Sequence, residues 1–90
     1  MIKESSIGKD IRERFFAALN VMIGSGRLKS YNEFISKHDI CHSNFMQIKN
    51  NPSIGQIKAE WIYYVCDDFC ISTEWIIFGV GNFFCERKRV

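Results

Sequence analysis

The sequence predicts a single all-α domain, a compact five-helix bundle, and three observations lead to this prediction. Apolar residues recur at spacings of three and four, as they do on one face of a helix. The apolar segments are separated by Ser, Asp, Asn, Gly and Pro, which favour helix ends and turns. Hydrophobic residues make up 47% of the 90 positions, enough for a small packed core rather than a disordered chain. We expect residues 10–84 to form the domain, between a flexible N-terminal arm at 1–9 and a basic tail at 85–90.

The first helix is expected to start at Asp10, because Asp10 is followed by Glu13 in the spacing of a helix N-terminal cap. Its apolar residues keep to one face for about three turns, and the glycines at 24 and 26 end it. These apolar residues are Ile11, Phe15, Ala18, Leu19, Met22 and Ile23.

Residues 30–51 are expected to form two short helices joined by a tight turn, the arrangement of a helix-turn-helix. Ser30 and Glu33 have the spacing of a capping box, so a helix should start at Tyr31. Its inward residues would be Tyr31, Phe34, Ile35 and His38, after which Asp39 suits a left-handed turn position. The next helix should begin at Cys41 or His42 and end at Asn50. Only Phe45 and Ile48 on it would be buried.

This last helix carries more outward polar groups than a short helix needs for solubility. Amides, hydroxyls and imidazoles are the groups with which proteins read base edges in the major groove. We therefore predict four base-reading residues: His42, Ser43, Asn44 and Gln47. The alternative is a solvated helix face that happens to be rich in amides.

Other polar residues on either side of this helix are candidates for phosphate contacts. Arg27 and Lys29 precede the free backbone N–H groups at the start of the Tyr31 helix, and a polar loop follows Asn50. The predicted phosphate-contacting residues are Lys29, Ser30, Lys49, Asn50, Asn51, Ser53 and Lys58. For residues 27–29, a solvated connector is an equally acceptable reading.

Two further helices are expected. The first, about 57–69, would bury Ile57, Trp61, Val65 and Phe69 at intervals of four and leave Tyr63, Tyr64, Asp67 and Asp68 outward. The second would be capped by Ser72, run through Phe78 and end at Gly79 and Gly81, with Trp75 closing the core. More apolar residues follow than a small domain can bury, which predicts a dimer interface. We assign to it Phe78, Val80, Phe83 and Phe84.

Two segments together resemble the lambda-repressor-like, or XRE/Cro-type, helix-turn-helix domain, especially phage-type repressors. One is the unit at 30–51. The other is the run CISTEWIIFGVG at 70–81, which is similar to the closing pattern of that family. The chain departs from the pattern at Asp39 and Asn51, where glycine is usual, and at Cys41, where Ser, Thr or Asn is common. The resemblance covers 10–84 and implies a transcriptional regulator that binds a palindromic double-stranded DNA operator as a homodimer.

The net charge of +2 is too small to indicate a nucleic-acid partner, but the charges are unevenly distributed. Between residues 27 and 58 there are five basic and two acidic residues, a balance of +3. Between 60 and 74 there are four acidic residues and no basic ones, a balance of −4. This favours a molecule whose helix-turn-helix side faces a polyanion, although chance clustering of charges would produce the same counts.

Several classes of function find no support in the sequence. Cys66 and Cys70 are spaced i, i+4, which is not the spacing of a structural zinc knuckle, so we expect no metal or other cofactor. No nucleophile and base pair or phosphate-binding glycine loop is visible, so an enzyme is not expected. We see neither a transmembrane helix nor a secretory leader and expect a cytoplasmic protein that does not bind membranes. The remaining alternative is a protein-interaction module with the same fold, such as an antitoxin subunit or an adaptor.

Overall fold

The computed structural model describes residues 6–51 and 57–85, and this part of the chain folds into five helices without a strand. They are α1 (Ser6–Gly24), α2 (Tyr31–Lys37), α3 (His42–Asn50), α4 (Ala59–Phe69) and α5 (Thr73–Phe78). The prediction of an all-α chain with five helices is confirmed. No helix among the described residues is long and apolar enough to cross a membrane.

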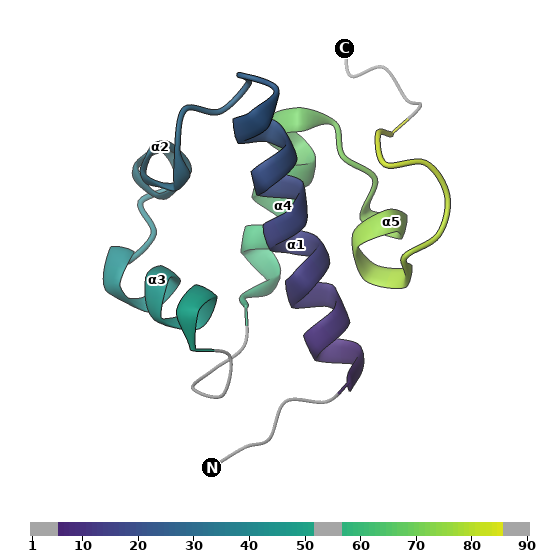
Figure 1. Cartoon of the computed structure of the whole chain (residues 1–90), viewed down its shortest axis with the longest axis horizontal. Helices are drawn as coiled ribbons and strands as arrows, with labels where there is room; N and C mark the ends of the chain where they lie inside the picture. Colours follow the sequence, from purple (N-terminus) through teal and green to yellow (C-terminus); the bar gives the residue numbers. More distant parts are fainter. Residues whose placement is uncertain (1–5, 52–56, 86–90) are drawn as a thin grey trace.

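The long helix α1 lies at the centre of the molecule, with α4 beside it (Figure 1). The short pair α2 and α3 lies on one side of α1, and α5 lies on the other. In the described part of the chain, no helix packs over one face of α3.

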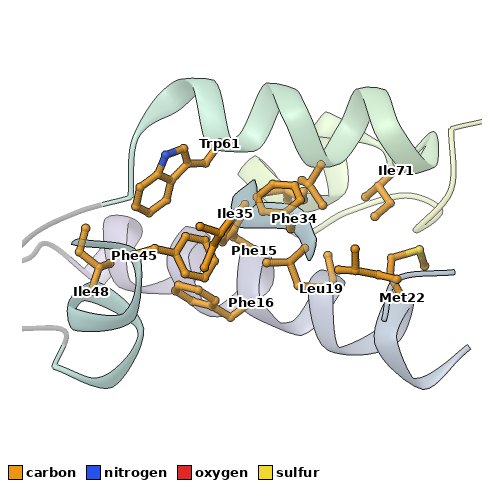
Figure 2. Close-up of a cluster of buried hydrophobic side chains, with 14 residues drawn as sticks. Phe15, Phe16, Leu19, Met22, Phe34, Ile35, Phe45, Ile48, Trp61 and Ile71 are labelled. Carbon is orange, nitrogen blue, oxygen red and sulfur yellow. The ribbon is translucent and has the colours of Figure 1, made fainter. Parts of the chain in front are cut away.

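The core is dominated by aromatic side chains that come from four helices (Figure 2). Phe15 of α1 lies within 6.3 Å, centroid to centroid, of the rings of Phe34, Phe45 and Trp61. Most of these pairs meet edge to face or at a tilt, which suits the ring quadrupoles. Phe15, Phe34 and Phe45 are fully buried, so α1, α2 and α3 are held by one shared cluster.

Helix α1 begins at Ser6 rather than at Asp10, so both the predicted start and the arm at 1–9 need correction. Asp10 lies inside the helix, and residues 6–9 form an extra turn. The sequence prediction missed this turn because it placed the cap at Asp10, although Ile7 continues the four-residue spacing of Ile11 and Phe15. Ile7 itself is 70% exposed. Extending an existing helix by a turn costs little once the helix is nucleated. Residues 1–5 lie outside the described part of the chain.

The start of α2 confirms one half of the predicted capping box and corrects the other. The Ser30 hydroxyl accepts a hydrogen bond from the backbone N–H of Glu33, as predicted. The Glu33 carboxylate, however, accepts from the N–H of Lys29, one residue before the cap. At the other end, Asp39 has the predicted left-handed conformation, with φ of 53°.

Helix α4 begins at Ala59, two residues later than predicted, because Lys58 is its extended N-cap residue. It ends at Phe69, as predicted, and is followed by the C-cap residue Cys70, whose left-handed conformation, with φ of 56°, the sequence did not suggest. The start of α5 is confirmed, since the Ser72 hydroxyl accepts from the N–H of Trp75 at 3.3 Å. Trp75 is half-buried against the core.

The C-terminal end of α5 is held by Arg14 from the middle of α1. Arg14 donates from Nε to the carbonyl oxygen of Ile76 at 2.7 Å and from Nη2 to that of Ile77 at 2.9 Å. These carbonyls are in the last turn of α5, where no intrahelical donor is left for them. Gly79 follows with φ of +71°, and a Cβ atom there would lie 2.9 Å from Nη1 of Arg14. Gly79 therefore provides both the left-handed turn and the space for the guanidinium group.

Candidate nucleic-acid interface

Helix α3 buries two side chains in the core, as predicted. Phe45 is 0% exposed and Ile48 is 3% exposed. On the opposite side of the helix, Ser43, Gln47 and Asn50 are all exposed. Because these three residues are spaced four and three apart, they form one continuous outward row, which we call the α3 polar face.

The other two predicted base-reading residues, His42 and Asn44, lie at opposite edges of this face. The imidazole of His42 is exposed and shares a hydrogen bond of 3.0 Å, through Nε2, with Oδ1 of Asn32 on α2. Asn44 is half-buried on the α4 side. It lines a cavity of about 140 Å³ whose other walls are His38, Asp39, Ile40, Cys41, Lys58, Glu60, Trp61 and Tyr64. The structure thus brings Ser43 and Gln47 together and places His42 and Asn44 beside them.

Two further residues of α3 lie closer to the core than predicted. Met46 is half-buried and packs against the core cluster, so its predicted outward position is wrong. Lys49 is also half-buried, with Nζ 5.0 Å above the ring of Tyr31 in a cation–π contact. The Tyr31 hydroxyl donates in turn to the side-chain oxygen of Asn20. Burial raises the pKa of Tyr31, an effect opposed by the hydrogen bond to Asn20.

The predicted phosphate-contacting residues are mostly on the surface. Lys29, Ser30, Asn50, Asn51 and Lys58 are exposed, and Ser53 lies outside the described residues.

The surroundings of Lys29 and Arg27 make a phosphate contact there less favourable than the sequence suggests. The Glu33 carboxylate already accepts from the Lys29 N–H and places a negative charge at the start of α2. The guanidinium of Arg27 lies 5.1 Å from the ring centroid of Phe84, near the C-terminal end of the chain.

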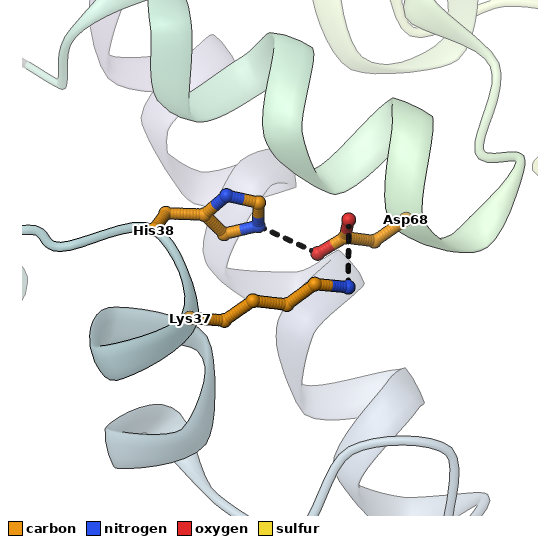
Figure 3. A network of polar contacts seen from close by, with 3 residues as sticks. All are labelled: Lys37, His38 and Asp68. Atoms are coloured by element: carbon orange, nitrogen blue, oxygen red, sulfur yellow. Dashed lines mark hydrogen bonds and ion pairs between the residues drawn. The ribbon is translucent and has the colours of Figure 1, made fainter.

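The main feature that the sequence did not reveal is a buried acid between α2 and α4. The side chain of Asp68, predicted to face outward, is only 8% exposed. Its Oδ2 lies 2.7 Å from Nε2 of His38, and its Oδ1 lies 3.1 Å from Nζ of Lys37 (Figure 3). The ring of Tyr64, also predicted outward, stacks on that of His38 at a centroid distance of 4.0 Å. The i, i+4 spacing of Tyr64 and Asp68 was the available signal, since it places both on the side of α4 that faces His38.

This network also reduces the charge separation that the sequence indicates. Lys37, counted on the basic side, pairs with Asp68, counted on the acidic side. The Lys37 side chain is 60% exposed, so part of its field still reaches solvent. Besides Lys37, the basic groups close to α3 in sequence are Lys49, which is half-buried on α3 itself, and Lys58, which is exposed before the start of α4.

The predicted dimer interface is exposed at three of its four residues. Phe78 is 73% exposed, Val80 55% and Phe84 41%. Phe83 is half-buried instead, with its ring packed edge-on against Trp75 at 4.7 Å. Phe83 therefore closes the core on the α5 side, which leaves three residues for contact with another surface.

All four cysteines are free thiols, two exposed and two half-buried. Among the described residues, no group of three or more His, Cys, Asp and Glu side chains is arranged to hold a metal ion.

Known proteins add no assignment to this geometry. A scan against protein-family models, a search of curated proteins and a search of solved structures each found no match to the chain.

Proposed function

We propose that this domain is a sequence-specific double-stranded DNA-binding regulator, with α2 and α3 as a helix-turn-helix and α3 as the recognition helix. The observation that supports this most directly is the α3 polar face. Ser43, Gln47 and Asn50 are exposed side by side, and α3 contains no acidic residue that would repel phosphate.

The chemistry of this face suits base edges in the major groove. In a helix-turn-helix the N-terminal half of the second helix meets the bases. Gln47 can form two hydrogen bonds with adenine, which offers one donor and one acceptor there, and the Ser43 hydroxyl can donate or accept. His42 and Asn44 lie at the edges of the face, where they would meet neighbouring base pairs or the backbone. Lys49 and Lys58 would neutralise phosphates on either side.

The experiment is selection of binding sites from random duplex DNA, followed by affinity measurements on the selected site and on single-base variants. Gln47→Ala should cost about 1–3 kcal/mol at one base position and relax specificity there. Lys58→Ala should weaken binding to all sequences alike and reduce the slope of log affinity against log salt by about 1.

Thr73→Ala is a suitable control, because Thr73 is exposed on α5, on the other side of α1 from α3. Each variant must retain the helical circular dichroism and melting temperature of the parent. If Gln47→Ala binds the selected site with unchanged affinity and sequence preference, Gln47 does not read a base.

We further propose that the domain acts as a two-fold dimer through Phe78, Val80 and Phe84. Two recognition helices about 34 Å apart would then enter successive major grooves of a palindromic site. Repression would follow from occupancy of the operator. In sedimentation experiments Phe78→Ser should shift the protein toward monomer, and the selected site should then shrink to one half-site.

A second candidate function, a protein-interaction module such as an antitoxin subunit or an adaptor, is favoured by the same exposed apolar residues. An exposed Phe on a small domain is a common interface residue. The selection experiment separates the two functions. An interaction module would enrich no sequence and would bind DNA only weakly and with strong sensitivity to salt.

A further inference from the structure

The last described residues of the chain return to pair with the segment that follows α4 (Figure 1). The Ser72 N–H donates to the Phe83 carbonyl at 2.8 Å, and the Cys85 N–H donates to the Cys70 carbonyl at 2.6 Å. Together these bonds form an antiparallel bridge centred on Ile71 and Phe84. Ile71 is 2% exposed, so one side of this bridge is anchored in the core.

The bridge brings the backbones of two cysteines together. In an antiparallel ladder, the residues on either side of a non-hydrogen-bonded pair are hydrogen-bonded pairs with Cα atoms roughly 5.5 Å apart. Cys70 and Cys85 flank this bridge, but Cys70 has a left-handed rather than an extended backbone, so the observation that places the two residues together is the hydrogen bond between their backbones. Disulfides in proteins usually span Cα separations of about 4.4–6.8 Å, a range that includes the ladder spacing.

The three cysteines in this region differ in accessibility. Cys85 is exposed and can meet a reactant in solution, whereas Cys66 and Cys70 are half-buried. Burial, together with the nearby Cys85, raises the pKa of the Cys66 thiol to about 11. A raised pKa lowers the thiolate fraction of Cys66, and Cys70 is the cysteine whose backbone is bonded to that of Cys85, so Cys70 is the thiol favoured to attack a modified Cys85.

We propose that Cys85 and Cys70 form a reversible redox site, which closes to a disulfide when the domain meets an oxidised low-molecular-weight disulfide such as glutathione disulfide. The Cys85 thiolate attacks one sulfur of glutathione disulfide, forms a mixed disulfide and releases one glutathione thiolate. The Cys70 thiolate then attacks the Cys85 sulfur and releases the second glutathione. The two protein thiols lose two electrons and two protons, and one glutathione disulfide becomes two glutathione molecules.

The bridge would fasten the C-terminal segment, which carries Phe84, to the end of α4. In the reduced protein this segment is held by the two backbone hydrogen bonds of the bridge and by the packing of Phe83 on Trp75. Closing a loop of about 15 residues restricts the unfolded chain, so the oxidised form should melt at a higher temperature than the reduced form.

The test incubates the full chain with glutathione disulfide, blocks remaining thiols with iodoacetamide and measures intact mass and non-reduced peptides. We expect two of the four cysteines to escape alkylation, a peptide cross-link between Cys70 and Cys85, and full reversal by dithiothreitol. Cys85→Ser and Cys70→Ser should abolish the cross-link.

Cys66→Ser and Cys41→Ser serve as matched controls and should leave the cross-link in place. Circular dichroism of each variant shows that it is folded, so a missing cross-link reports on chemistry rather than on misfolding. A cross-link from Cys85 to Cys66, a dimer joined through the exposed Cys41, or four alkylated cysteines after oxidation would each overturn the proposal.

Discussion

The contact between Arg14 and Gly79 leads to a prediction about the stability of the fold. Gly79→Ala should destabilise the fold in two separable ways. The left-handed backbone at φ of +71° costs a residue with a Cβ atom about 1 kcal/mol. The new Cβ would also lie 2.9 Å from Nη1 of Arg14, so the guanidinium must move.

The second cost is limited by what Arg14 contributes. Its two hydrogen bonds to the carbonyls of Ile76 and Ile77 are charge-assisted, and bonds of this type contribute about 1.5–3 kcal/mol each when buried. Arg14 is only half-buried, so we expect the pair together to contribute about 2 kcal/mol. Gly79→Ala should therefore cost about 3 kcal/mol in the parent chain and about 1 kcal/mol where Arg14 has already been replaced by Ala.

A double-mutant cycle in urea unfolding measures this difference. The four proteins are the parent, Arg14→Ala, Gly79→Ala and the double variant, and the expected interaction energy is about −2 kcal/mol. Gly26→Ala is a matched control, because Gly26 has φ of +84° with no atom near its missing Cβ. Gly26→Ala should show only the cost of the left-handed backbone, both in the parent chain and in the Arg14→Ala variant.

The result that would refute this reasoning is additivity. If Gly79→Ala costs the same with and without Arg14, to within about 0.5 kcal/mol, the guanidinium does not depend on the space beside Gly79. The left-handed turn would then be the whole reason for a glycine at this position.

Three further predictions concern stability. Asp68→Ala should lower the unfolding free energy by about 2 kcal/mol in urea. Most of this loss should come from the contact with His38, because Lys37 is largely exposed and its ion pair with Asp68 contributes little. A loss no larger than that of Lys37→Ala would contradict this. Burial raises the pKa of Cys66 from 9.0 to about 11, so the folded state favours the protonated thiol. This stabilisation is complete below pH 9.0 and is lost as the pH rises toward 11. The unfolding free energy of a Cys66→Ala variant should therefore fall less steeply than that of the parent between pH 9 and pH 11. Cys41→Ser should raise the unfolding free energy by about 0.5–1 kcal/mol, because Cys41 is the N-cap residue of α3 and makes no side-chain capping bond. An unchanged urea midpoint would show that the serine hydroxyl does not reach a free N–H at the start of α3.

Much of the fold could be predicted from local signals. Ser30, Ser72 and Asp39 each act through bonds or dihedral angles within a few residues, and all three were predicted in their observed roles. The buried pair Phe45 and Ile48 was likewise predicted from spacing alone. Such features depend on the nearest turns of chain, which a single sequence displays directly.

The features that were missed depend on residues far apart in the sequence. The burial of Asp68 depends on His38 and Lys37, which are 30 and 31 positions away, and the i, i+4 spacing with Tyr64 shows only that the two residues share one side of α4. Arg14 looks like a surface residue of α1 until α5 places two carbonyls beside it, 62 and 63 positions later. The extra turn of α1 was missed for a different reason, because the spacing of Asp10 and Glu13 predicts a cap at a point where the helix is continuous.

For the candidate interface, the polar composition of α3 could be predicted, but the division of roles among its residues could not. The sequence spacing groups Asn44 with Ser43 and Gln47, yet Asn44 faces a cavity whose walls include α4. That cavity lies between the turn that follows α2, Asn44 of α3 and the N-terminal part of α4, which are brought together only in the folded chain. His42 likewise forms a hydrogen bond with Asn32 on α2, and the sequence does not show the angle between α2 and α3 that allows this contact.

The position of Phe45 has a consequence for how this domain can change. Its ring contacts those of Phe15, Phe16, Tyr31, Phe34 and Trp61, so the tilt of α3 depends on aromatic residues that are buried or, for Tyr31, half-buried. Replacing Ser43 or Gln47 would then change the outward side chains of α3 without changing the orientation of the helix. Conversely, replacing Phe16 by a smaller residue would rotate or loosen α3 while every outward side chain stayed the same. On this helix of nine residues, the side chains that set its orientation are thus different from those that a partner would contact.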